Sequence, residues 1–333
     1  MIKYDNKYYE NVIEKFNYDY VTNFLNIDSN VIDRNWICSY NLNEFIDGFK
    51  NGNSHLIIMG MGINGVPHMG TVSQMLKAIY LQKMGFNVQI VLGDLDVYGA
   101  RSKPLEEIRI LVDKYKSFLI NLGFDTTKGI IRNQFDFPEI IRTSFLLARC
   151  IKDKDFEEID EDINELYKTE RVYQGMDFNV KQSISLMFAD FIHPGLFDKV
   201  DNVLVISGID EHGYVYKADE IRKRMGIKMS ISGLYSKMMR GLNNYPKMSK
   251  SIPLSSISLS SSKNELRKLL LHEKFDYTDS TDSFVYQLME YVSFYDTKTL
   301  NVLKKHCDNK SEKWLLDVEN YVADLYNICK MWR

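Results

Sequence analysis

The first residues with types and spacing suited to chemistry form a glycine-rich stretch, GMGINGVPHMGT, from Gly60 to Thr71. It follows a short apolar run that starts at His55 and is expected to be a buried strand. Glycines let the backbone approach a ligand closely, and the start of the helix expected next offers unpaired N–H groups to a phosphate. His68 stands where its imidazole could donate to that phosphate. A tight turn with a capping histidine explains the same residues, so the stretch alone does not establish phosphate binding.

Two later stretches could bind the other parts of a nucleotide. SGID ends a second apolar run at Ser207–Asp210, and a carboxylate at a strand end can accept hydrogen bonds from ribose hydroxyls. YPKMSKS, further along the chain, contains Lys247 and Lys250, which could clamp a polyphosphate from a mobile loop. Each stretch is also typical of an ordinary strand end or a solvated loop. The three stretches in this order are more specific than any one of them.

The composition is that of an ordinary globular protein. Of the 333 residues, 45% are apolar and 26% are charged, which argues against extended disorder. The formal net charge of −3 means that a nucleic acid would have to bind through a local patch. Neither a zinc site nor a disulfide framework is indicated, because no C-x-x-C pair joins the four cysteines, Cys38, Cys150, Cys307 and Cys329. The first residues lack an apolar signal segment and no apolar run approaches about 18 residues, so we expect a cytoplasmic protein without a membrane span.

Strands and helices are expected to alternate around these stretches. Helical periodicity runs from about Gly70 to Met84 and from Pro104 to Asn121. Apolar runs predict four strands, at residues 55–63, 87–98, 128–135 and 201–210. This alternation predicts an α/β protein with a doubly wound, Rossmann-like parallel sheet whose ligands bind at the carboxyl ends of the strands. After Leu259 the pattern is helical to the end of the chain.

PHMG and KMSKS, about 180 residues apart on this alternating chain, resemble the two signatures of class I aminoacyl-tRNA synthetases. Within that class the chain is similar to the tryptophanyl/tyrosyl subclass, and most similar to the catalytic domain of the tryptophanyl enzymes. The matching stretches follow one another in the order GMGINGVPHMG, VLGDLDVYGARSKPLEEIR, SLMFAD, SGIDE and KMSKSIPLSSISL. The resemblance covers roughly residues 55–270 and implies the HUP-type Rossmann-like fold of that class.

The resemblance implies three regions. Residues 1–52 would be an N-terminal extension packed on the main body, whose role the sequence does not reveal. Residues 53–260 would be the Rossmann-like domain that binds ATP and the amino acid, with an acidic insertion at 151–180. Residues 261–333 would form a reduced α-helical C-terminal domain, shorter than the region with which the family usually reads an anticodon.

The reaction implied by the resemblance needs no protein nucleophile. An amino-acid carboxylate attacks the α-phosphate of ATP, pyrophosphate leaves, and the aminoacyl group passes to the terminal ribose of a tRNA. The protein orients the reactants and stabilises the charge that grows on the phosphate oxygens. ATP and Mg²⁺ are the implied cofactors, an amino acid and a tRNA are the implied partners, and a homodimer is the implied assembly.

The signatures of the family carry over to this chain residue by residue. His68, Thr71, Lys247 and Lys250 would act in catalysis, the histidine on a phosphate and the lysines on the β- and γ-phosphates. Asp210 matches the aspartate expected at the ribose hydroxyls. The remaining contacts to ATP would come from Gly60, Gly62, Gly70, Gly208, Met248 and Ser249.

The resemblance also implies a pocket for the side chain of the amino acid. Asp190 aligns with the aspartate that recognises an indole N–H or a phenol O–H, although a carboxylate on a helix surface is the other reading of this residue. Met187 falls where tryptophan enzymes have methionine, and Ile58 stands where tyrosine enzymes have tyrosine, so tryptophan is favoured over tyrosine. Ser183 and Glu211 complete the predicted pocket.

Three positions depart from the pattern of the family. Thr71 replaces the second signature histidine, Glu211 replaces a glutamine, and Ser183 replaces the tyrosine that faces the substrate ammonium. With the short C-terminal region, these changes leave two alternatives to a tryptophanyl-tRNA synthetase. One is a related enzyme that passes the activated amino acid to a small amine or a carrier, and the other is a non-catalytic protein that binds tRNA or an amino acid. The amino acid, the acyl acceptor and the assembly state therefore stay open.

Overall fold

The computed structural model describes residues 3–333 with the exception of residues 102, 158, 160–163, 174 and 273–276. The described chain forms two compact units. Unit 1 comprises Met1–Gly65 and Lys77–Met238, and unit 2 comprises Val66–Leu76 and Met239–Arg333. The division into three regions, residues 1–52, 53–260 and 261–333, stays a prediction and differs from this division into two compact units.

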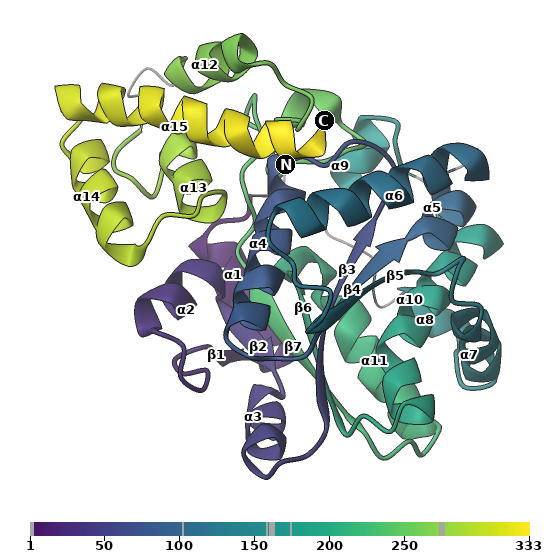
Figure 1. The fold of residues 1–333 in the computed structure, drawn as a ribbon. Helices are drawn as coiled ribbons and strands as arrows, with labels where there is room; N and C mark the ends of the chain where they lie inside the picture. The colour runs from purple at the N-terminus through teal and green to yellow at the C-terminus, as the bar shows by residue number, and fades with distance from the viewer. Residues whose placement is uncertain (1–2, 102, 158, 160–163, 174, 273–276) are drawn as a thin grey trace. The chain divides into compact units, whose positions relative to one another are not determined.

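Unit 1 is built on a mixed β-sheet (Figure 1). Over the described residues the sheet has seven strands, in the order β1-β2-β7-β6-β3-β4-β5. They are β1 (Asp19–Tyr20), β2 (Cys38–Tyr40), β3 (His55–Gly62), β4 (Val88–Gly93), β5 (Gly129–Asn133), β6 (Asn202–Gly208) and β7 (Ser230–Ser236). The strands from β7 to β5 pair in parallel, whereas β2 is antiparallel to both β1 and β7. The order of the parallel strands reverses between β3 and β6, so the predicted doubly wound α/β architecture is confirmed.

Helices precede, connect and follow these strands. In unit 1 they are α1 (Asn6–Phe16), α2 (Ser29–Asn35), α3 (Leu42–Lys50), α5 (Asp94–Arg101), α6 (Leu105–Asn121), α7 (Glu139–Ala148), α8 (Asp153–Glu157), α9 (Asn164–Thr169), α10 (Phe178–Phe197), the 3₁₀ helix η1 (Ile209–Glu211) and α11 (His212–Arg224). Helix α4 (Met69–Lys83) has its first residues in unit 2 and its last in unit 1. In unit 2 they are η2 (Pro253–Ser255), α12 (Lys263–Leu271), α13 (Phe284–Tyr291), α14 (Thr297–Asp308) and α15 (Glu312–Trp332). The helical region predicted after Leu259 is confirmed.

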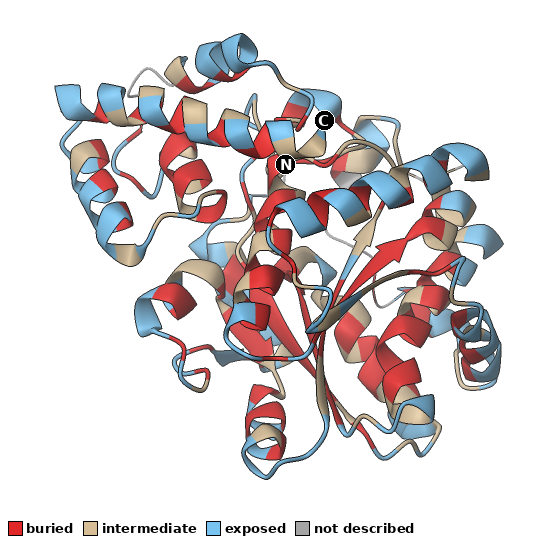
Figure 2. Ribbon diagram, viewed as in Figure 1, coloured by how far each residue is buried: buried red, intermediate tan, exposed pale blue. Residues whose placement is uncertain are grey.

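The apolar runs of unit 1 are strands that helices cover. Every residue of β4 and of β6 is buried, and the strands are accordingly among the red segments of Figure 2. Parallel strands buried on both faces read as continuous apolar runs, which is why they could be predicted. One core cluster joins Ile58, Val91 and Val205 of the sheet to apolar residues of α1, α7, α10 and α11.

All four predicted strands extend past the observed ones, three by one to three residues and one by more. The strand expected at residues 87–98 ends at Gly93, and the following residues form α5. The carboxylate of Asp94, the first residue of α5, accepts the backbone N–H of Leu95 at 2.9 Å and two N–H groups of the segment after β5 at 2.9 and 3.0 Å. These hydrogen bonds favour a turn into a helix over a continued strand.

Three strands are absent from the sequence-based prediction. Strand β7 has no continuous apolar run because Ser232 and Gly233 interrupt it, yet all of its residues after the first are buried. The short strands β1 and β2 belong to the N-terminal extension and lengthen the sheet beyond β7, where Cys38 is opposite Tyr235. The extension is therefore part of the sheet, and not only a segment packed on it.

The acidic insertion lies partly outside the described residues, which exclude residues 158, 160–163 and 174 of it. Its described part contains α8 and α9, and Asp155 of α8 is buried. The carboxylate of Asp155 lies 2.8 Å from Nη2 of Arg224 and 3.8 Å from Nζ of Lys217, both on α11. These ion pairs hold the start of the insertion against α11.

Unit 2 is stabilised by contacts of α15 with the other C-terminal helices. The hydroxyl of Tyr321 on α15 lies 2.9 Å from the carbonyl oxygens of both Leu288 and Val292, and so anchors the end of α13. Helix α12 begins with a capping box in which Ser262 and Glu265 satisfy each other's backbone N–H groups. In the part of the chain that the structure describes, no helix is both long and apolar enough to cross a membrane.

Candidate functional site

The PHMG and KMSKS stretches lie together within unit 2. The segment before α4 pairs with the segment that continues KMSKS: His68 bridges Ser258 in antiparallel fashion, and two backbone hydrogen bonds of 3.0 and 3.1 Å flank the bridge. This pairing brings His68 close enough to Lys250 and Lys247 for both positive charges to act on its imidazole. All four residues predicted to act in catalysis, Thr71 included, are thus in one unit.

His68 is a neutral imidazole that caps a helix. Its Nδ1 accepts the backbone N–H of Thr71, in the first turn of α4, at 3.2 Å. Burial, together with the positive charges of Lys250 and Lys247, lowers the pKa of His68 to about 3. A neutral ring that accepts at Nδ1 carries its proton on Nε2, which is the atom that can donate to a phosphate. The capping role is therefore present, and it is compatible with phosphate binding.

Gly70 leaves room for the ring of His68. A Cβ at this position would lie 3.0 Å from two ring atoms of His68, Cε1 and Nδ1, which is tighter than ordinary van der Waals contact. The glycine predicted at ATP thus has a function inside the protein, because it lets the ring turn back onto the first turn of α4. Its contact with ATP stays a prediction.

A group of serines, which we call the serine cluster, holds the KMSKS stretch; it consists of Ser249, Ser255 and Ser256. The backbone N–H of Ser249 donates to the hydroxyls of Ser255 and Ser256 at 2.9 and 3.0 Å. The hydroxyl of Ser256 donates in turn to the carbonyl of Ser249 at 3.1 Å. Two backbone groups of KMSKS are therefore satisfied by side chains from the sequence that follows it.

The first four side chains of KMSKS divide into a buried and a more exposed pair. Met248 and Ser249 are buried within unit 2, whereas Lys247 and Lys250 are half-buried. The lysines are therefore the residues of this stretch that present charge at the surface of unit 2. The ATP contacts predicted for Met248 and Ser249 stay predictions.

In unit 1, the glycines at the ends of β3 and β6 differ in how much space a side chain would have. A Cβ at Gly60 would meet no atom within 4 Å, so the space beside this exposed backbone is open. A Cβ at Gly62 would lie 3.2 Å from Cγ2 of Val97. A Cβ at Gly208 would overlap the carboxylate of Asp210 and would displace that side chain. The open space at Gly60 is what a backbone needs if a ligand is to approach it.

Asp210 and Glu211 lie in η1, directly after β6. Asp210 is half-buried with its carboxylate close to Gly208, while Glu211 is exposed. Because β3 and β6 are neighbouring parallel strands, their carboxyl ends share one edge of the sheet. The structure therefore groups Gly60, Gly62, Gly208 and Asp210 at the reversal of strand order, where sheets of this kind bind ligands.

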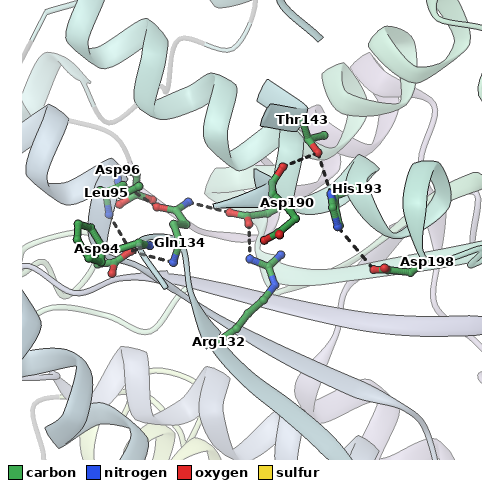
Figure 3. Close-up of polar contacts among 11 residues, drawn as sticks. Asp94, Leu95, Asp96, Arg132, Gln134, Thr143, Asp190, His193 and Asp198 are labelled. Atoms are coloured by element: carbon green, nitrogen blue, oxygen red, sulfur yellow. Dashed lines mark hydrogen bonds and ion pairs between the residues drawn. The ribbon is translucent and has the colours of Figure 1, made fainter. Parts of the chain in front are cut away.

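Asp190 on α10 is held in a buried ion pair (Figure 3). Its Oδ1 lies 2.8 Å from Nη1 of Arg132, and its Oδ2 accepts from Nε2 of Gln134 at 2.8 Å. The side chains of Asp190 and Arg132 are only 4% and 10% exposed. Burial raises the pKa of Asp190, and the charge of Arg132 with the hydrogen bond from Gln134 opposes that rise. The alternative reading of Asp190 as a carboxylate on a helix surface is wrong.

Arg132 and Gln134 are the members of this network that the sequence-based prediction missed. With the amide oxygen of Gln89 turned toward it, Arg132 donates to that oxygen from Nε and Nη2 at 3.2 Å each. The guanidinium also lies over the ring of Phe137, 5.0 Å from the centroid. The available signal was a pair of polar residues inside the apolar run KGIIRNQF, since buried polar groups in a sheet need partners.

Three other predicted pocket residues, Ser183, Ile58 and Met187, have structural contacts within unit 1. The hydroxyl of Ser183 lies 3.0 Å from the carbonyl oxygens of both Asp96 and Asn179, so it ties α10 to α5. Ile58 is fully buried, and Met187 packs against the same core cluster while remaining partly exposed. The sheet and α10 therefore bring Ile58 and Met187 to one core, and their contact with an amino acid stays a prediction.

Comparison with known sequences identifies a matching family. The sequence model described as "tRNA synthetases class I (W and Y)" matches residues 50–327. The tryptophan–tRNA ligase of Methanocaldococcus jannaschii is 25% identical over 290 residues, which cover 79% of this chain and 73% of that protein. The tyrosine–tRNA ligase of Methanosarcina barkeri is 40% identical over 70 residues, which cover 21% of this chain and 22% of that protein.

Comparison with solved structures shows the same fold. The tryptophanyl-tRNA synthetase of the archaeon Aeropyrum pernix superimposes with a TM-score of 0.77 at 18% identity, over 98% of this chain and 94% of that one. The tyrosyl-tRNA synthetase of Archaeoglobus fulgidus, solved with L-tyrosine, gives a TM-score of 0.71 at 17% identity, over 89% and 95% of the two chains. The fold is thus common to proteins named for either amino acid.

Proposed function

Because this chain belongs to the class I tRNA synthetases of the tryptophan and tyrosine type, we propose that it activates tryptophan with ATP and transfers the tryptophanyl group to a tRNA. Members of this family are ligases that use an amino acid, ATP and a tRNA. The observation that carries the proposal is the backbone pairing within unit 2 that sets a neutral His68 beside Lys247 and Lys250. We place the reaction in the cytoplasm.

We assign the phosphate chemistry to these three side chains. A carboxylate oxygen of the amino acid bonds to the α-phosphorus, and the bond from that phosphorus to the bridging oxygen breaks as pyrophosphate leaves. Negative charge moves onto the phosphate oxygens, where Nε2–H of His68 donates and Lys247 and Lys250 attract. The described residues contain no group of three or more His, Cys, Asp and Glu that could hold a metal, so Mg²⁺ would be bound chiefly through the phosphates of ATP, whose charge it would neutralise.

We assign the nucleoside to the carboxyl edge of the sheet in unit 1. Asp210 would accept hydrogen bonds from ribose hydroxyls, and the open space at Gly60 supports a close approach of the ligand to the backbone. Gly62 and Gly208 would keep the neighbouring backbone free of side chains. Within unit 2, Thr71 and Gly70 would contribute to phosphate binding at the start of α4, whose N-terminus favours negative charge.

The choice of tryptophan rests on two apolar residues of the core cluster and on one buried acceptor. Ile58 and Met187 offer no hydroxyl or amide to a phenol, which disfavours tyrosine. Oδ1 of Asp190 accepts from Arg132 and Oδ2 accepts from Gln134, and a carboxylate oxygen can accept a second hydrogen bond, here from an indole N–H. Arg132 and Gln134 would hold that carboxyl group in its orientation. Glu211, which is exposed, would attract the substrate ammonium with the help of Ser183.

A homodimer is part of the proposal, and an apolar stripe on α7 supports it. Ile141 and Phe145 are one helical turn apart and 47% and 82% exposed, and Leu146 beside them is 43% exposed. The opposite face of α7 packs inward through Ile140, Thr143 and Leu147. A second copy of the chain would cover the exposed stripe.

Pyrophosphate exchange tests the activation step. The purified protein is incubated with ATP, labelled pyrophosphate and each of the twenty amino acids in turn, and label should enter ATP with tryptophan alone. Lys250→Ala should slow exchange by on the order of 10²-fold, as for loss of one preorganised charge donor. Lys313→Ala, at an exposed lysine of α15, is the matched control and should behave as the unaltered protein. Absence of exchange with every amino acid would overturn the proposal.

A further inference from the structure

The N-terminal extension reaches the residue that follows the predicted ribose site. His212 is the first residue of α11 and comes directly after η1, which contains Asp210 and Glu211. The hydroxyl of Tyr18, from the segment between α1 and β1, lies 2.9 Å from Nδ1 of His212. The ring of Phe16 packs edge-on against the same imidazole, with the centroids 4.5 Å apart. All of these residues belong to unit 1.

The direction of the Tyr18 to His212 hydrogen bond follows from the state of the imidazole. Burial lowers the pKa of His212 to about 4, against the opposing effect of Asp210, so the ring is neutral near pH 7. Burial also raises the pKa of Tyr18, so its hydroxyl keeps its proton and is the donor. Nδ1 of His212 therefore accepts, and Nε2 carries the ring proton.

Tyr18 is buried, and the extension around it contacts both the sheet and α11. It is only 5% exposed, and its ring centroid lies 5.3 Å from that of Tyr235 on β7. The hydroxyl of Tyr40, at the end of β2, donates to Oδ2 of the fully buried Asp219 on α11 at 2.7 Å. Since β2 also pairs with β7, the extension is fixed to both the sheet and α11. The extension can therefore hold the hydroxyl of Tyr18 in a fixed position.

The position of the Asp210 carboxylate depends on the turn that His212 ends. Asp210 lies in this turn, η1, and its carboxylate occupies the space in which a side chain at Gly208 would lie, so the backbone of the turn sets where the carboxylate is placed. We propose that Tyr18 is a positioning residue for the nucleotide site, because its hydrogen bond to His212 fixes the turn that presents Asp210 to the ribose. The inference rests on the proposed function, since it assumes that Asp210 binds ribose hydroxyls.

Removal of one hydroxyl tests this role. Tyr18→Phe should raise the KM for ATP in pyrophosphate exchange by roughly 3- to 10-fold with kcat little changed, as for loss of one buried hydrogen bond. With 2′-deoxy-ATP, which lacks a ribose hydroxyl for Asp210 to hold, the increase should be much smaller. Tyr20→Phe, on β1 and 56% exposed, is the matched control and should leave both KM values unchanged.

A purely structural role would produce a different pattern. An equal rise in KM for ATP and 2′-deoxy-ATP, or no rise for either, would overturn the inference. His212→Leu, which removes the acceptor, should match Tyr18→Phe, and the double variant should be no worse than either single one. Independent, additive effects would also overturn it.

A variant of the carboxylate separates this inference from the proposed function. Asp210→Asn should abolish most of the preference for ATP over 2′-deoxy-ATP. If it does so while Tyr18→Phe has no effect on that preference, only the inference about Tyr18 fails. If Asp210→Asn leaves the preference intact, the proposed ribose site fails and the role of Tyr18 fails with it.

Discussion

The role of Asp190 depends on a buried partner of opposite charge. The motif around Asp190 indicated a carboxylate in a pocket, but its partner Arg132 could not be read from the motif, because the two are 58 positions apart in sequence. Their pairing depends on how β5 and α10 pack. The sequence gives the type of each residue. The partners that determine its charge state can be identified only from the structure.

Loss of Asp190 should therefore harm stability as well as specificity. Asp190→Ala leaves the guanidinium of Arg132 buried without a counter-charge, which should lower the free energy of unfolding by about 3–5 kcal/mol. Urea titration measures this, and Asp198→Ala, at a largely exposed carboxylate at the end of α10, is the control. The double variant Asp190→Ala/Arg132→Met should recover part of the loss. A single variant as stable as the unaltered protein would contradict the buried pair.

Where Asp190→Ala remains folded, it should also change which amino acid is activated. The expected change is a relative gain for substrates without an N–H donor, measured as kcat/KM in pyrophosphate exchange for tryptophan and phenylalanine. The KM for ATP should stay nearly constant. An unchanged amino-acid profile would count against Asp190 as the acceptor of the indole N–H.

Histidines with lowered pKa values should make the protein sensitive to acid. The pKa of His68 is about 3 and that of His212 about 4 in the folded chain, and burial lowers the pKa values of His55 and His193 as well. Unfolding returns each histidine to its ordinary pKa of about 6.5, so the unfolded chain binds more protons between about pH 6.5 and 4. Stability should therefore be greatest above about pH 7 and fall as the pH drops toward 4.

Thermal unfolding between pH 7.5 and 4.5 measures this dependence. His212→Gln should flatten the decline of Tm with falling pH, whereas His272→Gln, at an exposed histidine that follows α12, should leave its slope unchanged. A Tm that stays constant or rises on acidification would show that these histidines are not buried in their neutral form.

The elements that carry the site differ in how far sequence predicts them. Strands β3, β4, β5 and β6 follow apolar runs and were predicted, because parallel strands covered on both faces require such runs. Strand β7 was missed because Ser232 and Gly233 break its run while packing in the interior. The strands β1 and β2 of two and three residues are set by pairing to β7, a contact that no local pattern encodes.

The serine cluster is an element-scale feature that should control the KMSKS lysines. Removing the hydroxyls of Ser255 and Ser256 together deprives the backbone N–H of Ser249 of both acceptors. The double variant Ser255→Ala/Ser256→Ala should form the adenylate about 10-fold more slowly, the effect of losing one to two net hydrogen bonds. Rapid-quench measurement of the adenylate burst is the test.

The control for the serine cluster is Ser260→Ala. The hydroxyl of Ser260 is exposed and lies 2.9 Å from the hydroxyl of Ser258. It should leave the burst rate unchanged. The KM for the amino acid should also be unchanged in the double variant. A burst as fast as that of the unaltered protein would mean that the lysines do not depend on these serines.

At the scale of the whole molecule, assembly is the first question. Phe145 is 82% exposed on α7, and Phe145→Asp should convert a dimer into a monomer in sedimentation velocity, because a charge cannot be buried unpaired in an apolar interface. Ile110→Asp, at a residue of α6 that is 61% exposed, should leave the dimer intact. A protein that is monomeric without any substitution would remove this part of the proposal.

An aminoacylation assay shows whether this protein charges tRNA with tryptophan. The purified protein is incubated with ATP, Mg²⁺, labelled tryptophan and total tRNA, and label in acid-precipitable tRNA is counted beside parallel reactions with tyrosine and phenylalanine. We expect charging with tryptophan that requires ATP and is about 100-fold slower in Lys250→Ala. Pyrophosphate exchange with tryptophan but no label in tRNA would contradict it, and would indicate an enzyme that delivers its activated amino acid to another acceptor.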